Sequence, residues 1–260
     1  MLWQSTTVIG SAIHATDGSI GSVSDLLFEE NSWSIRWIVV DTGNWLPGRK
    51  VLLPPAALQQ SEAAPQAFLV DLTRQQVEES PPLASDAPVS RQSESRIYGY
   101  YGWTPYWYPG LAVYPGYPGP IGLSPIAPGG RAMAPGPAGD VPDLPEGEHG
   151  DPNLRSVNEV TGYYVHAKDG DIGHVELLMV EDESWAIRYI VVDTRNWWPG
   201  RKVLVATRWF RDVSWNDQQI HVELTRDEVR NSPEYDPAAT VDRAYEEELY
   251  SHYRQRPYWL

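Results

Sequence analysis

Short apolar segments separated by turns recur along the chain and predict β-strands rather than long helices. In them, branched aliphatic and aromatic side chains alternate with polar ones, the two-residue period of a strand with one buried face. In the first part of the chain these segments are residues 8–13, 20–29, 35–41, 49–53 and 67–72. Asp17-Gly18 forms a tight turn between two of them, since glycine accepts the positive φ of hairpin turns. Five short strands with closely spaced turns predict a small antiparallel β-barrel.

This pattern occurs twice. The segment Ser32–Leu52 returns as Ser184–Leu204, and the offset of 152 positions holds without a gap from Val8 to the pair Tyr106-Trp107, which returns as Tyr258-Trp259. Repetition at a fixed offset predicts two copies of one structural unit. We therefore predict an all-β protein of two tandem antiparallel barrels with short helices. The expected boundaries are 1–107 for the first barrel with its tail, 108–159 for a linker, and 160–260 for the second barrel with a C-terminal helix.

The strand predicted at residues 35–41 is apolar on both faces. Trp37 and Val39 lie on one face, and Ile38 and Val40 lie on the other. A strand of this kind is covered on both sides, and only one side can fill the barrel. The second barrel, the repeat's own tail or another chain could cover the other side, and we predict that the barrels pair there. The residues assigned to this pairing are Trp37, Val39, Tyr189, Val191, Trp45, Trp197 and Trp198.

Each barrel is followed by a tail that ends in aromatic residues. Residues 240–253 place apolar side chains at helical spacing, typical of an amphipathic helix, whereas Gly99 and neighbouring serines weaken the equivalent helix of the first copy. Exposed aromatic clusters are unfavourable, so we expect both tails to pack on a barrel. The residues assigned to this docking are Tyr106, Trp107, Leu249, Tyr258 and Trp259.

Two further segments complete the prediction. Residues 73–80 start a short helix with Thr73 as the N-cap, and the prolines that follow end it. Residues 109–139 are dominated by Pro and Gly and predict an extended or disordered linker, which ends in the acidic stretch 140–151.

Composition narrows the possible functions. The formal net charge is -15, which disfavours binding to nucleic acids and to anionic membranes. The chain has no cysteine, so disulfides and thiolate metal sites play no part. It shows neither a signal peptide nor an apolar run of the roughly 18 residues that a membrane helix needs. We expect a cytoplasmic protein.

The repeated pairs His14 with Asp17 and His166 with Asp169 are the best candidates for chemistry. As a metal site, each pair needs another ligand, but His221 has no counterpart in the first copy, where Leu69 stands. Catalysis and metal binding stay open as alternatives. The interpretation we favour is structural, with the histidines beside a hairpin, so we expect no metal, cofactor or catalytic residue.

The Asp-Thr and Arg-Lys pairs around the central turn also allow both a functional and a structural interpretation. Asp41 would need a second carboxylate to act in catalysis, whereas a structural Asp41 accepts backbone N–H bonds of the turn or pairs with Arg49. Arg49-Lys50 beside Trp45 could bind single-stranded nucleic acid, but this net charge favours a solvated strand edge. The residues assigned to structural turns are Asp17, Gly18, Asp41, Pro47, Gly48, Asp169, Gly170, Asp193, Pro199 and Gly200.

The string Ile-Val-Val-Asp-Thr-x-Asn-Trp-x-Pro-Gly-Arg-Lys-Val-Leu, preceded by Asp-Gly-x-Ile-Gly, resembles the PRC-barrel family. That family includes the cytoplasmic domain of the photosynthetic reaction centre H subunit and the C-terminal domain of a ribosome-maturation factor. The resemblance covers residues 8–82 and 160–234. It implies a small β-barrel in each half and a role in docking or assembly, with no common catalytic centre.

From these observations we expect a non-enzymatic scaffold whose barrels pair with each other and dock a protein partner, with a homo-oligomer as a further possibility. A second hypothesis, from the resemblance alone, is an accessory or assembly factor of a photosynthetic or electron-transfer complex. A third is a metal-dependent enzyme that uses His14 and His166.

Overall fold

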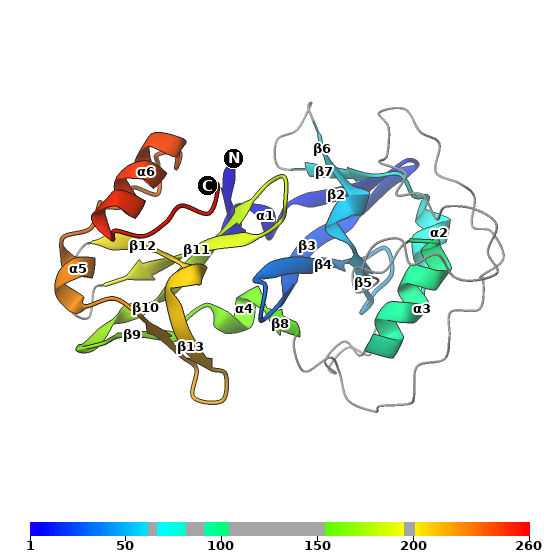
Figure 1. Cartoon of the computed structure of the whole chain (residues 1–260). Helices are drawn as coiled ribbons and strands as arrows, with labels where there is room; N and C mark the ends of the chain where they lie inside the picture. Colours follow the sequence, from blue (N-terminus) through cyan, green and yellow to red (C-terminus); the bar gives the residue numbers. More distant parts are fainter. Residues whose placement is uncertain (62–66, 82–90, 104–153, 195–200) are drawn as a thin grey trace, which may run out of the picture.

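The computed structural model describes residues 1–61, 67–81, 91–103, 154–194 and 201–260, and folds them into two β-sheets of matching topology (Figure 1). The first sheet has the strand order β5-β4-β3-β2-β7-β6, and the second has the order β12-β11-β10-β9-β14-β13. This confirms the predicted all-β architecture with two barrel-like units. Each sheet also takes up one short strand from the opposite half of the chain.

The first half contains these elements: β1 (Leu2–Gln4), α1 (Ser5–Val8), β2 (Ala12–Ala15), β3 (Gly18–Glu29), β4 (Ser34–Asp41), β5 (Lys50–Leu53), the 3-10 helix η1 (Pro55–Ala57), β6 (Leu58–Gln60), β7 (Ala67–Val70), α2 (Arg74–Glu78) and α3 (Arg91–Tyr101). The second half contains β8 (Leu154–Ser156), α4 (Val157–Val160), β9 (Tyr164–Ala167), β10 (Gly170–Glu181), β11 (Ile187–Asp193), β12 (Lys202–Ala206), η2 (Thr207–Trp209), β13 (Phe210–Ser214), β14 (Gln219–Val222), α5 (Arg226–Arg230) and α6 (Arg243–His252).

The strand prediction differs from the structure in several places. The entry strand begins at Ala12, because the chain first forms α1 and then turns at Gly10, where φ is +95°. β6 was not predicted, and residues 154–159 belong to β8 and α4 although the sequence assigned them to the linker. The sheet is also not purely antiparallel, since β2 pairs with β7 in parallel. No tight turn joins these two strands, so nothing imposes an antiparallel direction.

The repeated turn residues hold each short helix against its barrel. Asp17 accepts a hydrogen bond from the backbone N–H of Arg74 at 2.8 Å, and Asp169 accepts one from Arg226 at 2.7 Å. At the other end of α2, the Arg49 guanidinium donates to the carbonyl oxygen of Glu78 at 2.5 Å. The carboxylate of Asp41 accepts from the backbone N–H of Gly43 at 2.8 Å. These contacts give Asp17, Asp169, Arg49 and Asp41 roles within the fold.

Two details of the repeated motif follow from backbone geometry. Gly21, the last residue of Asp-Gly-x-Ile-Gly, has φ +139°, and a Cβ there would overlap the carbonyl oxygen of Asp41. Only glycine allows β3 and β4 to approach so closely. Thr73 is the N-cap of α2, with Gln76 completing a capping box, which confirms the predicted start of this helix.

The helix that follows each barrel covers the outer face of its central strand. Trp37 on β4 donates its indole N–H to the buried Glu94 of α3, and Tyr98 packs on the indole with ring centroids 4.8 Å apart. In the second half, Tyr189 on β11 donates its hydroxyl to the buried Glu246 of α6 at 2.7 Å. A helix forms at residues 91–101 despite Gly99, because this contact stabilises it.

The second tail continues past α6 and lies back on the barrel (Figure 1). Leu249 is fully buried, and the Tyr258 hydroxyl donates to Glu246 at 3.0 Å and to Glu181 at 3.3 Å. The guanidinium of Arg243 lies 4.0 Å from the centre of the Trp259 ring. Burial raises the pKa of Tyr258 above its ordinary value, and the neighbouring carboxylate of Glu246 raises it further. Tyr258 therefore stays protonated as a hydrogen-bond donor.

Candidate interaction site at the junction of the barrels

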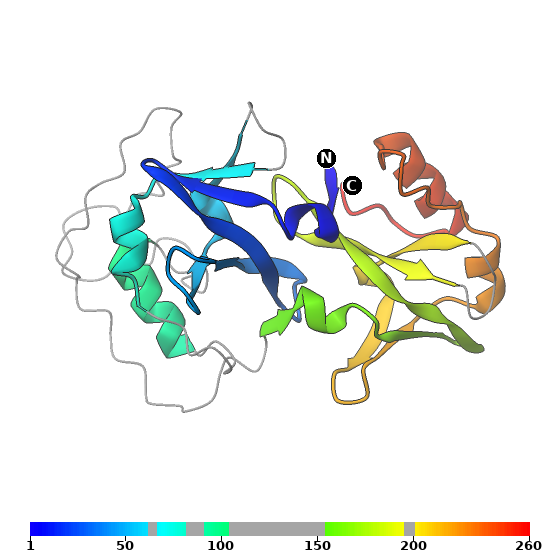
Figure 2. The ribbon, with the colours of Figure 1, turned by 180° about the vertical axis from the view of Figure 1, so that it is seen from behind.

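Each half of the chain completes the sheet of the other half. β1 pairs antiparallel with β10, with Leu2 opposite Glu181 and Trp3 opposite Val180. β8 pairs antiparallel with β3, with Arg155 opposite Phe28. In Figures 1 and 2 the N-terminal strand lies against the second barrel, and β8 lies against the first. The exchange hides strand edges that would otherwise be open to other chains.

The tips of the two long hairpins also meet. The backbone N–H of Ile35 donates to the carbonyl of Trp185 at 2.9 Å, and the N–H of Ile187 donates to the carbonyl of Trp33 at 2.7 Å. Because residues 33 and 35 correspond to 185 and 187, the contact has approximate two-fold symmetry. The two barrels therefore meet through equivalent segments.

Charged pairs fix the exchanged strands at both of their contacts. Arg155 in β8 pairs with Glu30 at 2.9 Å, and the N-terminal amine of Met1 pairs with Asp182 at 2.6 Å. Glu30 and Asp182 are equivalent positions of the two halves. A hydrogen bond from Ser156 to Asp25 at 2.5 Å is specific to the first barrel, since the second has Leu177 at the position of Asp25.

Burial raises the pKa of Asp25 above its ordinary value of 3.8, although hydrogen bonds from Ser156 and from the backbone N–H groups of Leu26 and Asn158 oppose the shift. The protonated carboxyl is therefore favoured more in the folded chain than in the unfolded one. Relative to Asp25→Asn, wild type should lose stability as the pH rises from 3.8 through the folded-state pKa of Asp25. Urea unfolding of both proteins across this range measures the difference. A difference that grows in favour of wild type over the same range would contradict the assignment.

A tryptophan at each hairpin tip points across the junction. Trp33 stacks on Phe28 with ring centroids 4.8 Å apart and meets Phe210 of the other barrel edge-on at 5.1 Å. On the opposite side, Trp185 lies 5.5 Å from Trp3 and 6.0 Å from Phe68. Trp33 and Trp185 have φ of 53° and 54°, a left-handed conformation that is strained for a bulky residue. The aromatic contacts across the junction offset this strain.

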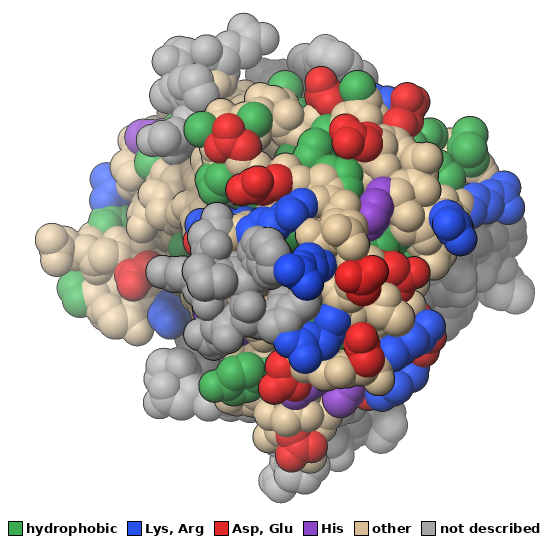
Figure 3. Space-filling model, turned by 90° about the vertical axis from the view of Figure 1, so that its left-hand side faces the viewer, with side chains coloured by type: hydrophobic (Ala, Val, Ile, Leu, Met, Phe, Trp, Pro, Cys, Tyr) green, Lys and Arg blue, Asp and Glu red, His purple; other side chains and the backbone are tan. Residues whose placement is uncertain are grey.

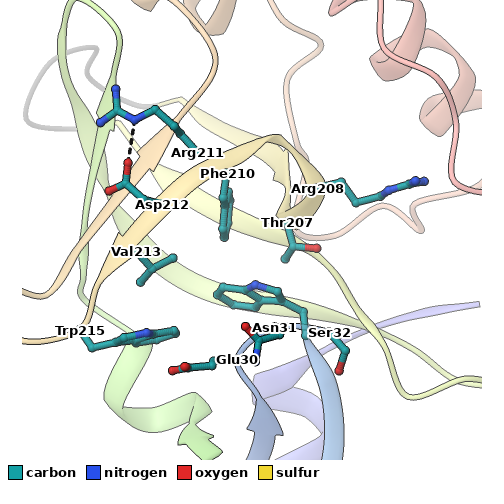
Figure 4. Close-up of a pocket in the computed structure, with 11 residues that line it drawn as sticks. Glu30, Asn31, Ser32, Thr207, Arg208, Phe210, Arg211, Asp212, Val213 and Trp215 are labelled. Atoms are coloured by element: carbon teal, nitrogen blue, oxygen red, sulfur yellow. Dashed lines mark hydrogen bonds and ion pairs between the residues drawn. The ribbon is translucent and has the colours of Figure 1, made fainter. Parts of the chain in front are cut away.

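A hollow of about 460 Å³ opens beside Trp33. One wall comes from the hairpin tip of the first barrel, residues 30–33, and the other from η2 and β13 of the second barrel. In Figure 4 Phe210, Val213 and Trp215 line the hollow, and Arg211 and Asp212 form an ion pair at its edge. The guanidinium of Arg155 lies 4.4 Å from the centre of the Trp215 ring. We call this hollow the junction groove.

The residues that the sequence assigned to barrel pairing lie elsewhere. Trp37 and Val39 pack in the cluster under α3, Tyr189 lies under α6, and the guanidinium of Arg74 lies 4.6 Å from the centre of the Trp45 ring. Val191 is fully buried. The outer face of the central strand is thus covered by the tail of the same repeat. This tail was one of three possible covers, beside the second barrel and another chain.

Six of the assigned residues fall outside the described part of the chain. They are Tyr106, Trp107, Trp197, Trp198, Pro199 and Gly200. Conversely, the junction residues Trp3, Trp33 and Trp185 were missed. The recurrence of a tryptophan at positions 33 and 185, directly before the central strand, was the available signal.

The histidine and the aspartate of the second repeated pair, His166 and Asp169, bind different partners. His166 contacts Asp171 at 2.5 Å and stacks on His221 with ring centroids 5.2 Å apart, whereas Asp17 and Asp169 bind helix N–H groups. Within the described ranges, no three His, Asp or Glu side chains lie close enough together to hold a metal ion. A search of the same ranges finds no helix long and apolar enough to cross a membrane.

Comparison with known proteins agrees with the fold. Residues 5–77 match the family model of the PRC-barrel domain. A protein of Deinococcus radiodurans described as "Uncharacterized protein" is 32% identical over 99 residues, which is 37% of this chain and 34% of that protein. The matched region thus spans about a third of the relative's length. The family match suggests a protein-interaction module.

Proposed function

We propose that the chain, whose residues 5–77 match the family model of the PRC-barrel domain, is a non-enzymatic scaffold that docks a protein partner through its two joined barrels. The observation that carries the proposal is the reciprocal exchange of β1 and β8. Two barrels that share strands keep one relative orientation, whereas barrels joined only by a linker reorient freely. A fixed pair of barrels presents a composite surface that neither barrel has alone.

The surface chemistry supports a protein partner. On the face of the second barrel that Figure 3 shows, basic and acidic side chains of the described residues lie side by side. A nucleic acid would need a continuous basic surface, and the net charge of -15 opposes it. Half-buried aromatic residues at the junction are of the type that dominates binding energy in protein interfaces.

Affinity capture of the tagged full chain from its native host tests this proposal. We expect a reproducible protein partner, which then binds the purified chain at a fixed ratio in light scattering. Trp185→Ala, which weakens the junction, should reduce this binding, whereas Glu183→Ala on the exposed turn before it should not. A partner that binds both variants as tightly as wild type would contradict a role for the joined barrels.

The same capture tests the narrower hypothesis of an accessory or assembly factor. That hypothesis rests on the family's reaction-centre member, and it requires components of a photosynthetic or electron-transfer complex among the captured proteins. The hypothesis of a metal-dependent enzyme has no support in the described residues, where Asp17 and Asp169 bind helix ends.

A further inference from the structure

The junction groove has an apolar floor and a polar rim. Phe210, Val213 and Trp215 are half-buried and contribute the floor, next to the edge of Trp33. The rim carries exposed polar side chains, Asn31 and Ser32 among them. Grooves with flat aromatic walls and hydrogen-bonding edges suit an extended peptide whose backbone is not paired in a helix or sheet.

Only the second copy of the repeat carries aromatic residues at the positions of Phe210 and Trp215, which line the groove. At the positions equivalent to Phe210, Val213 and Trp215, the first half of the chain has Leu58, Ser61 and Ala63. Two of the three apolar wall residues are therefore replaced by small ones. The barrel fold does not require this aromatic wall, because the first half forms the same strand order without it. In the second half, Phe210 and Trp215 of this wall also contact Trp33 of the first barrel, with ring centroids 5.1 and 6.2 Å apart.

Proline-flanked tyrosines have the chemistry that fits such a wall. A proline ring is compact and apolar, its fixed φ pre-orders an extended peptide, and the backbone carbonyls remain free for donors at the rim. Tyrosine adds an aromatic face that packs on tryptophan and a hydroxyl that stays in water. Binding of this kind costs little conformational entropy, since the peptide is already extended.

This chain carries such a sequence itself. The triplet Tyr-Pro-Gly occurs at residues 108–110, 114–116 and 117–119, in the segment between the barrels. Leu154, the first described residue after that segment, pairs with Glu29, next to the groove residue Glu30. The segment therefore ends beside the groove, and closing a loop of this kind costs only about 0.6 kcal/mol for each doubling of its length.

We propose that the junction groove binds proline-flanked tyrosines and that the Tyr-Pro-Gly triplets of the same chain occupy it. The proposal deepens the scaffold function, on which it rests, because a partner that uses the groove must displace the chain's own segment. A tethered segment has an effective concentration in the millimolar range, so a weak peptide contact suffices to hold it.

The indole N–H signals of Trp33 and Trp215 in NMR spectra of the full chain test this proposal. Single Phe substitutions assign the two signals among the twelve tryptophans. The triple variant Pro109→Ala, Pro115→Ala, Pro118→Ala should shift both signals. Addition of an excess of the peptide of residues 112–120 to that variant should return them to their wild-type positions. The matched control replaces Pro120, Pro125 and Pro128, which no tyrosine precedes, and should leave both signals in place.

Three results would overturn the proposal. The first is unchanged indole signals in the first triple variant, and the second is an equal shift of these signals in the control variant. The third is a shift of the wild-type signals on dilution, which would show that a second copy of the chain occupies the groove. In the first triple variant, Val213→Asp should weaken peptide binding about tenfold or more, because it places a charge in the apolar wall. None of these measurements needs a partner protein, so their failure leaves the scaffold proposal standing, and a failed capture leaves the groove proposal standing.

Discussion

Replacement of Trp33 by alanine is expected to lower the free energy of unfolding by about 3–5 kcal/mol, the range for a large aromatic side chain removed from a packed site. Trp33 is 8% exposed and contacts Phe28 of its own barrel and Phe210 of the other. Its loss opens a cavity that neither barrel can fill alone. Urea unfolding followed by circular dichroism measures the change, and the absence of cysteine removes disulfide chemistry from the refolding.

A glycine at the same position provides the control. Trp33 has φ 53°, which costs alanine about 1–2 kcal/mol and costs glycine little. Trp33→Gly should therefore be more stable than Trp33→Ala by about 1 kcal/mol, against the usual order of these residues. If alanine proved the more stable of the two, the left-handed conformation of the hairpin tip would be wrong.

Replacement of Trp37 by alanine should have an effect of similar size, about 3–5 kcal/mol, for a different reason. Trp37 is fully buried under α3 and donates to Glu94, so the variant loses the indole contacts and leaves a buried carboxylate without this donor. We expect α3 to detach, which limited proteolysis near residues 91–101 measures, while the junction of the barrels stays intact.

Trp37→Phe separates the two contributions. It keeps an aromatic ring under α3 but removes the N–H donor to Glu94, so it should cost less than Trp37→Ala. Tyr189→Phe is the matched change under α6, where the lost donor is the hydroxyl to Glu246. A loss of about 1–3 kcal/mol is expected for each. Protection of α3 in Trp37→Ala equal to wild type would contradict the role of Trp37 as its anchor.

The sequence predicted the local structure of each half well. Alternation of apolar and polar residues located β3 and β4, and glycines with Asp-Gly turns located the hairpins. Thr73 marked the start of α2 through its side-chain cap. Each of these features depends on interactions between residues close together in the chain, which local patterns capture.

The contacts between the halves were not predictable in this way. β1 and β8 are three residues long, so they carry no recognisable period, and their partners lie far away in the sequence. The strand at Trp37 is apolar on both faces, so the sequence predicted that its outer face is covered. The same pattern is compatible with a helix or with a second barrel as the cover. The junction groove combines residues 30–33 with residues 207–215, and the divergence of Trp215 from Ala63 is visible only when the two halves are compared.

The exchange of strands within one chain is the central claim, and a disulfide tests it most directly. Leu2 and Glu181 lie opposite each other in the pairing of β1 with β10, within the separation that a disulfide spans. The chain has no other cysteine, so Leu2→Cys with Glu181→Cys gives one possible bond. The control, Leu2→Cys with Glu29→Cys, uses the equivalent position of the chain's own barrel.

Non-reducing electrophoresis with light scattering, after mild oxidation of a dilute sample, provides the readout. The account predicts that the Leu2 and Glu181 pair closes within a monomer and that the control pair stays reduced. Disulfide-linked dimers of the first variant would show exchange between chains instead. Closure of the control pair would show that β1 returns to its own barrel, and either result would contradict the account.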